Sequence, residues 1–239
     1  MAGRTPTRRM TSEQIADTLT RTQLFGELGR DVLEELAHKF VERSFRRGQL
    51  IFQQGDPGDA LFVVAEGLLK VFVTSEEAEE MVLATLRPPE VFGELALVDG
   101  GPRSATAEAM EPVVLLVLTR TAFFEQLRAH PLITDSVFKM MATVLRRLTG
   151  HTADLVFLDL HGRVAKLLLA LGEDEGQKVG EEIGLDLHLT QRDLAGMVGG
   201  SRQSVNQILR SFERRGYLEL QGRKIILKNP ELLRKRAGL

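Results

Sequence analysis

The chain has 239 residues, no cysteine and a formal net charge of −2. This length allows one large domain or two modest ones, and we expect two. Without cysteine, disulfides, cysteine-held zinc, iron–sulfur clusters and thiol nucleophiles are excluded. No stretch approaches the roughly 18 apolar residues of a membrane span, and the start of the chain lacks the apolar segment of a secretory signal. We therefore expect a soluble, cytoplasmic protein without a membrane partner.

Charge is unevenly distributed along the chain. From residue 188 to the end, eleven Lys and Arg stand against four Asp and Glu, whereas the preceding part has 20 against 29. A basic C-terminal region on an acidic body is typical of nucleic-acid binding. A solvated basic surface would give the same count, so the charge alone leaves both interpretations open.

The first part of the chain predicts a short arm, helices and then a β-rich domain. Residues 1–20 are polar and basic, and we expect a flexible N-terminal arm with a helix beginning near Thr11. Apolar residues at helical spacing in 24–40 predict one or two short amphipathic helices. Short apolar runs broken by Gly, Pro and Asp in 42–118 predict a sandwich or barrel. The expected domain is 21–130.

A long helix is predicted over residues 131–157. Its apolar seam is Val137, Met141, Val144, Leu148, His151 and Leu155. Such a helix would be about 40 Å long at 1.5 Å per residue, so a small β domain cannot cover it and we expect it to pair with a second copy. Packing against its own domain is the alternative. A second domain, 158–239, begins with a hinge and a helix that ends at Gly172 in an acidic, solvated loop.

The C-terminal domain contains a predicted helix-turn-helix. Thr190 and Ser201 can cap two helices that are separated by the turn at Gly199 and Gly200. The second helix places Arg202, Gln203, Asn206, Gln207 and Arg210 on its outer face. Arg, Gln and Asn make paired hydrogen bonds to guanine or adenine edges in the major groove. A following hairpin turned at Gly222 predicts a wing with Arg223 and Lys224 at its tip, where phosphates could bind.

The stretch VFGELALVDGGPRSAT, residues 91–106, indicates a phosphate-bearing ligand with hydroxyls. A buried phosphate monoanion needs a fixed guanidinium and N–H donors, which Arg103 and its small neighbours can supply. A carboxylate such as Glu94 can accept a hydrogen bond from a ligand hydroxyl and then needs no further cation. A plain ion pair between Glu94 and Arg103 beside a turn is the alternative.

Both regions together resemble the CRP/FNR family of bacterial transcription regulators, and the resemblance covers nearly everything after Leu24. It implies an α+β fold with a cyclic-nucleotide-binding, jelly-roll-like β-roll, a long dimerisation helix and a C-terminal winged helix-turn-helix. It also implies a non-enzymatic homodimer that a cyclic nucleotide controls allosterically and that binds double-stranded DNA at pseudo-palindromic promoter sites. RNA polymerase is the further implied partner. The expected ligand is cAMP, with another cyclic nucleotide as the alternative and no metal.

The family's phosphate-binding cassette is similar to residues 92–106 and assigns roles to single residues. By this resemblance Glu94 accepts a hydrogen bond from the ribose 2′-hydroxyl and Arg103 pairs with the cyclic phosphate. Gly93 and Ser104 offer donors, and Ala105 leaves room. In cAMP-dependent members a Thr-Ser pair on the long helix contacts the adenine. The matching positions in this chain are Leu148 and Thr149. The expected ligand contacts are Gly93, Glu94, Leu95, Arg103, Ser104, Ala105 and Thr149.

The recognition helix departs from the best-known members, which carry Arg-Glu and a second Arg. Here Arg202 can keep a bidentate contact to guanine, whereas Gln203 favours adenine, so an altered half-site is expected. Thr190, Gln191, Arg192 and Ser201 fall where the family contacts phosphates. The expected DNA contacts are Thr190, Gln191, Arg192, Ser201, Arg202, Gln203, Ser204, Asn206, Gln207, Arg210, Arg223 and Lys224.

Other functions are weighed against the same residues. The histidines show no haem-ligand spacing, and GEDEGQK is one residue short of a P-loop with no Ser or Thr after its Lys. Two alternatives stay open beside the cyclic-nucleotide regulator. One is a regulator of the same type that binds DNA without ligand or with another effector, which Leu148 favours. The other is a regulatory subunit that works through protein contacts, with a merely structural C-terminal domain.

Overall fold

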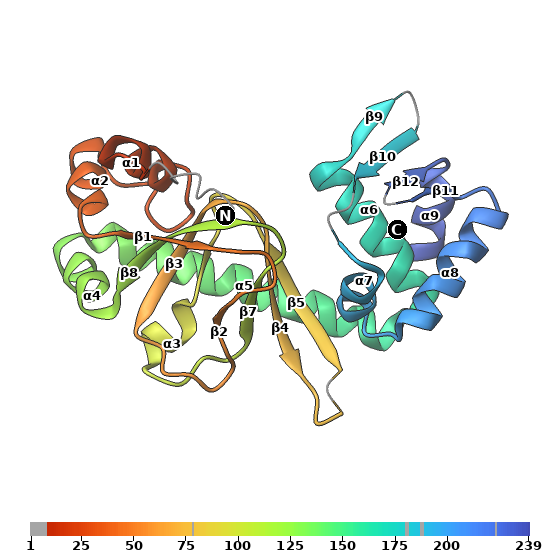
Figure 1. The fold of residues 1–239 in the computed structure, drawn as a ribbon, viewed down its shortest axis with the longest axis horizontal. Coiled ribbons are helices and arrows are strands. Elements are labelled where there is room, and N and C mark those ends of the chain that lie inside the picture. Colours follow the sequence, from red (N-terminus) through yellow and green to blue (C-terminus); the bar gives the residue numbers. More distant parts are fainter. Residues whose placement is uncertain (1–8, 78, 180–181, 187–188, 223) are drawn as a thin grey trace, which may run out of the picture. The chain divides into compact units, whose positions relative to one another are not determined.

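The computed structural model describes residues 9–77, 79–179, 182–186, 189–222 and 224–239 (Figure 1). Its contacts divide the chain into two compact units. One unit runs through residue 71 and resumes over 85–144, and the other combines 72–84 with 145–239. Helices and strands come largely in separate runs, as expected for the predicted α+β class, with a β-rich N-terminal part, a long helix and a C-terminal helix-turn-helix, so that prediction is confirmed.

Helix α1 (Ser12–Thr20) begins where a helix was predicted, near Thr11, and it shows that residues 12–20 of the expected flexible arm are helical. Thr11 caps it, and the reciprocal bond from Gln14 completes a capping box. Ile15 and Leu19 are buried in the core because α1 packs against α2 (Arg30–Ala37). The apolar face of residues 12–20 therefore fixes this segment, and residues 1–8 lie outside the described chain.

Two four-stranded antiparallel sheets make the β-roll. The first has the order β1 (Val41–Phe45), β8 (Val113–Thr119), β3 (Ala60–Glu66), β6 (Val91–Phe92). The second has the order β2 (Leu50–Phe52), β7 (Thr106–Ala109), β4 (Leu69–Thr74), β5 (Glu80–Leu86). In the first sheet β8 lies between β1 and β3, so this pairing brings together strands that are far apart in the chain.

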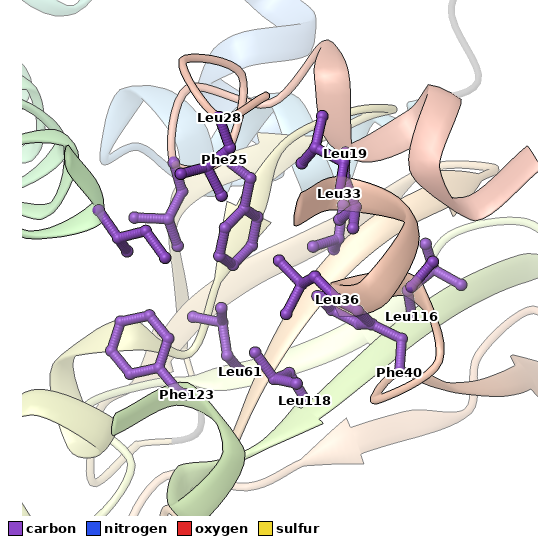
Figure 2. Packing of buried hydrophobic residues seen from close by; sticks show 14 of the residues in the cluster. Leu19, Phe25, Leu28, Leu33, Leu36, Phe40, Leu61, Leu116, Leu118 and Phe123 are labelled. Atoms are coloured by element: carbon purple, nitrogen blue, oxygen red, sulfur yellow. The ribbon is translucent and has the colours of Figure 1, made fainter. Parts of the chain in front are cut away.

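Helices cover one face of the first sheet. Strands β3 and β8 are almost continuously buried, and Leu61 and Leu118 project from them into the helical layer. Figure 2 shows these side chains packed with Phe25, with Leu36 of α2 and with Phe123 of α4 (Arg120–Ala129). This apolar layer holds the sheet rigidly, and the short helix α3 (Glu94–Asp99) follows directly from its edge strand β6.

Helix α5 (Pro131–Phe157) spans the range predicted for the long helix. Its first turns bury Ile133, Val137 and Met140 in the core of the first unit. Farther along, Leu145 and Leu148 are 65% and 44% exposed on this single chain. Val137 of the predicted seam thus packs within its own domain, whereas the pairing of the later turns with a second copy stays a prediction.

The second unit contains a four-stranded sheet with helices packed on it. The helices are α6 (Leu160–Glu175), α7 (Gln191–Val198), α8 (Arg202–Arg214) and α9 (Pro230–Ala237). The sheet order is β11 (Leu218–Gln221), β12 (Lys224–Leu227), β10 (Glu182–Asp186), β9 (Gln177–Val179). The predicted helix end at Gly172 is wrong, because α6 continues to Glu175. Strands β9 and β10 follow the helix where a solvated loop was expected.

The start of α6 provides a pH-dependent stability prediction at Asp159. Its carboxylate accepts the Gly162 N–H at 2.8 Å and pairs with Arg236. These two interactions, the first being larger, hold the Asp159 pKa below its ordinary value. Asp159→Ala is expected to lower the free energy of unfolding by about 1 kcal/mol through loss of the cap, measured by urea denaturation.

Asp159→Asn separates the charge from the cap, because Asn is an equally good cap. A lowered folded-state pKa gives a stabilisation that is present above the ordinary Asp pKa and is lost as pH falls through the folded value. The stability difference between the natural chain and Asp159→Asn should therefore shrink between about pH 7 and about pH 3. An unchanged difference over that range would contradict the assignment.

Candidate functional site

The backbone of residues 91–106 is fixed by two left-handed glycines and a neighbouring loop. Gly93 (φ 81°) begins α3 and Gly100 (φ 73°) ends it. The Arg103 N–H donates to Asp56 O at 2.8 Å, and Arg103 O accepts from Gly55 N–H at 2.9 Å. These bonds hold the segment in a defined position, so the direction of the Arg103 side chain is set by the fold.

Arg103 is a buried cation held by neutral groups. Its side chain is only 4% exposed, and its Nη1 and Nη2 atoms each donate at 2.8 Å to the carbonyls of Gly93 and Ala60. Its Nε is buried without a hydrogen-bond partner among the described residues. A buried donor without an acceptor is costly, and a charged one more so. The guanidinium is therefore prepared for an acceptor that the protein itself does not supply.

The surroundings of Arg103 favour an anion as that acceptor. Burial lowers the pKa of the Arg103 guanidinium, while the charges of Asp59 and Glu94 raise it. Arginine stays charged at any ordinary pH, so the group keeps its full charge in a poorly solvated place. A planar guanidinium with a free edge matches the oxygens of phosphate or carboxylate.

A cluster of three phenylalanine rings lies beside this guanidinium, two of them in contact with it, and the sequence did not indicate them. Phe62 and Phe92 are register partners on β3 and β6, and their rings stack at 5.1 Å between centroids. Phe52 of β2 lies against both rings, at 5.5 and 5.9 Å. The Arg103 Cζ is 4.4 Å from the Phe52 ring centroid and 5.3 Å from that of Phe62.

The structure brings together part of the predicted ligand set. The Gly93 carbonyl accepts a hydrogen bond from Arg103. Glu94 is partly exposed, and its charge acts on the Arg103 guanidinium. Ser104 is exposed, Ala105 is buried beside Arg103 in the chain, and Leu95 is 39% exposed. Thr149 belongs to the second unit, where its hydroxyl donates to Leu145 O at 2.9 Å. The predicted contact of Thr149 with a base stays a prediction.

The helix-turn-helix of the second unit is built by local capping. Thr190 and Asp193 form a capping box at α7, and Gly199 (φ 62°) ends that helix in the left-handed conformation. Ser201 then caps α8 by accepting from Ser204 N–H at 3.1 Å. The two caps and the glycine set the angle between the helices, which is the local requirement for this motif.

Helix α8 has a buried face and an exposed face. Its buried residues are Val205, Ile208, Leu209 and Phe212, and its exposed residues include Arg202, Gln203, Gln207 and Arg210. These orientations agree with the sequence pattern. Asn206 differs, because it is half-buried and its amide donates to Gln191 at 3.2 Å, which ties α8 to α7. A DNA-contact role for any of these residues stays a prediction.

Two further predicted phosphate contacts lie near α7 and on the wing. Arg192 extends from α7 and pairs with Glu80 at 3.3 Å, with its side chain 64% exposed. Strands β11 and β12 form the wing around Gly222 (φ 64°), and Lys224 is exposed beside this turn. Arg223 lies outside the described residues.

No group of three or more His, Asp or Glu residues within the described ranges is arranged to hold a metal ion. In the same part of the chain, no helix has both the length and the apolar character to cross a membrane.

Comparisons with known proteins match both halves of the chain. The cyclic nucleotide-binding domain matches residues 42–130 and the Crp-like helix-turn-helix domain matches 162–236. The chain is 32% identical over 221 residues to the CRP-like cAMP-activated global transcriptional regulator of Mycobacterium tuberculosis, covering 92% of this chain and 99% of that protein. It is 32% identical over 210 residues to the cyclic AMP receptor protein of Thermus thermophilus, covering 88% and 94%. A mutant CooA from Carboxydothermus hydrogenoformans aligns with a TM-score of 0.72 at 26% identity, covering 84% and 88%.

Proposed function

Because the chain belongs to the CRP/FNR family of transcription regulators, we propose that it is a sequence-specific DNA-binding homodimer that cAMP controls through its cyclic nucleotide-binding domain. The family that the sequence resembled is confirmed, and its members are transcription regulators rather than enzymes. The helix-turn-helix domain supports DNA as a partner. RNA polymerase enters the proposal as a partner only by analogy with the family.

One observation carries the ligand part of this proposal. Arg103 is buried, its two bonded acceptors are neutral carbonyls, and its Nε has no acceptor among the described residues. In the proposal this edge of the guanidinium binds the cyclic phosphate, and Glu94 accepts from the ribose 2′-hydroxyl. Gly93 and Ser104 donate to the phosphate. Leu95 and Ala105 line its surroundings.

The identity of the base is the finer part of the proposal. Two relatives that are 32% identical are described as cAMP-activated or as a cyclic AMP receptor, and this supports cAMP. Thr149 offers a hydroxyl to the adenine across the dimer, whereas Leu148 can only pack. Leu148 therefore favours the second candidate, a regulator of the same type that responds to another effector or binds DNA without one.

In this proposal the dimer couples nucleotide binding to DNA binding. The exposed apolar side chains of α5 after residue 144, among them Leu145 and Leu148, support pairing with a second copy. Two recognition helices would then read half-sites one duplex turn apart. The nucleotide shifts the dimer toward its DNA-binding arrangement only if it binds that arrangement more tightly than the other.

The test combines calorimetric titration of cAMP and cGMP with selection from randomised duplex DNA at fixed salt. Micromolar cAMP binding that strengthens selection of one palindrome supports the proposal and gives the half-site. Sequence-specific DNA binding that is indifferent to both nucleotides supports the second candidate. Nucleotide binding without binding to any DNA duplex would contradict the proposed transcription regulator. It would support the alternative of a regulatory subunit that acts through protein contacts.

Gly93→Ala is expected to weaken nucleotide binding at least tenfold in the same titration. A Cβ at Gly93 would lie 2.7 Å from Arg103 Nη1 and 3.1 Å from a Phe62 ring carbon, so the guanidinium must leave its place. Gly48→Ala is the matched control, because Gly48 has a similar φ of 76° and nothing within 4 Å of the added carbon. Equal losses in both variants would show that backbone strain alone acts.

A further inference from the structure

We propose that Phe52 is a positioning residue of the anion site, and this inference rests on the proposed function of the cassette. The Phe52 ring attracts the face of the Arg103 guanidinium and holds the group in the plane where its Nε edge meets a phosphate. Phe52 touches the arginine and does not itself bind the nucleotide phosphate. The ring electrons of Phe52 then contribute to cyclic-nucleotide affinity, in addition to the packing of its apolar surface.

Phe52 reaches the guanidinium from the opposite sheet of the roll. It ends β2 in the second sheet, where its partner across the strands is Ala107 of β7. The rings of Phe62 and Phe92 belong to the first sheet and stack on each other. Because Phe52 packs on both rings, its own ring is held beside Arg103 from both sheets.

The contacts of Arg103 leave its Nε–H without an acceptor among the described residues. The centroid of Phe52 lies 4.4 Å from Cζ, within the range of a cation–π contact. Gly93 O and Ala60 O take one N–H each from the two terminal nitrogens. A group that is held at its face and at both terminal nitrogens presents Nε without reorganisation, and such preorganisation favours binding.

Two carboxylates explain why loss of the ring attraction would reduce affinity. The charges of Asp59 and Glu94 act on Arg103 and favour a shift of the guanidinium toward them. A guanidinium that moves to a carboxylate forms an ion pair with it, so an incoming phosphate must compete with an internal anion. The energy of a cation–π contact corresponds to about a 2- to 30-fold change in affinity.

The test varies the ring electrons of Phe52 in the full-length protein while its shape is nearly kept. Phe52 is replaced by its 4-fluoro, 3,4,5-trifluoro and pentafluoro analogues, which progressively remove the negative face of the ring. Cyclic AMP affinity is measured for each by calorimetry, and it is expected to fall stepwise by about 2- to 30-fold in total. The same series at Phe25, a buried ring that packs on Phe40, is the matched control and should leave affinity unchanged.

A ligand-free measurement separates this inference from the proposed function. The NMR resonance of Arg103 Nε–H should be displaced by the ring currents of Phe52 and Phe62, and Phe52→Leu should reduce that displacement to the part due to Phe62. If the natural chain binds cAMP but the fluorinated series is flat, the positioning role is overturned and the nucleotide site stands. If the natural chain binds neither nucleotide, the proposed function fails. A displaced resonance that follows fluorination then supports the contact, and an undisplaced one overturns it.

Discussion

Arg103→Ala is expected to weaken cyclic-nucleotide binding by between about a hundredfold and ten-thousandfold in calorimetry, while the chain stays folded. Two charge-assisted hydrogen bonds of about 1.5–3 kcal/mol each account for this range. The variant also leaves the carbonyls of Gly93 and Ala60 without their donor, but it removes the desolvation penalty of a buried charge. These opposing changes are why we expect the fold to persist, which circular dichroism checks.

Two further variants define what the loss of Arg103 means. Arg43→Ala removes an exposed arginine of the same unit, on β1 at the opposite edge of the first sheet from β6, and it should leave nucleotide affinity unchanged. Arg103→Lys keeps the charge but not the planar pair of donors, so an intermediate loss is expected. Wild-type affinity in Arg103→Ala would refute the cassette as the phosphate site.

Much of the fold could be predicted from the sequence because helix caps and turns depend on residues that are close together in the chain. Thr190 and Ser201 were recognisable as caps because a hydroxyl before an apolar-periodic run satisfies helix N–H groups. Gly199 was recognisable as the turn because only the left-handed conformation joins the two helices so closely. Residues 91–106 were informative for the same reason, since the glycine, the carboxylate and the arginine stand close in the chain.

The missed features depend on register and tertiary contacts. Phe52, Phe62 and Phe92 come from three strands in two sheets, and their meeting beside Arg103 depends on pairing that no local pattern encodes. Gly172 looked like a helix end, yet α6 continues through it to Glu175. The chemistry of the Asn206 side chain suits both a DNA base and a neighbouring residue. The sequence therefore could not show that its amide donates to Gln191.

Arg202→Ala is expected to remove sequence selectivity while leaving general DNA affinity. Arg202 is exposed in the first turn of α8, and a bidentate contact to guanine contributes about 1–3 kcal/mol per half-site. Loss in both half-sites of a dimer corresponds to about 2–6 kcal/mol, or roughly 30-fold to more than ten-thousandfold on the selected palindrome. The salt dependence of binding should hardly change, because the partner of Arg202 is a base and not a phosphate.

Arg214→Ala is the matched control at the other end of the same helix, where an exposed arginine lies in the last turn, away from the turn between α7 and α8. It should change affinity for the palindrome and for unrelated duplexes alike. A selective loss in Arg202→Ala with an intact dimer, against a uniform change in Arg214→Ala, distinguishes a base-reading helix from a basic surface. If Arg202→Ala binds the palindrome as tightly as the natural chain, α8 does not read that base, and the exposed arginines of the second unit serve solvation or protein contacts instead.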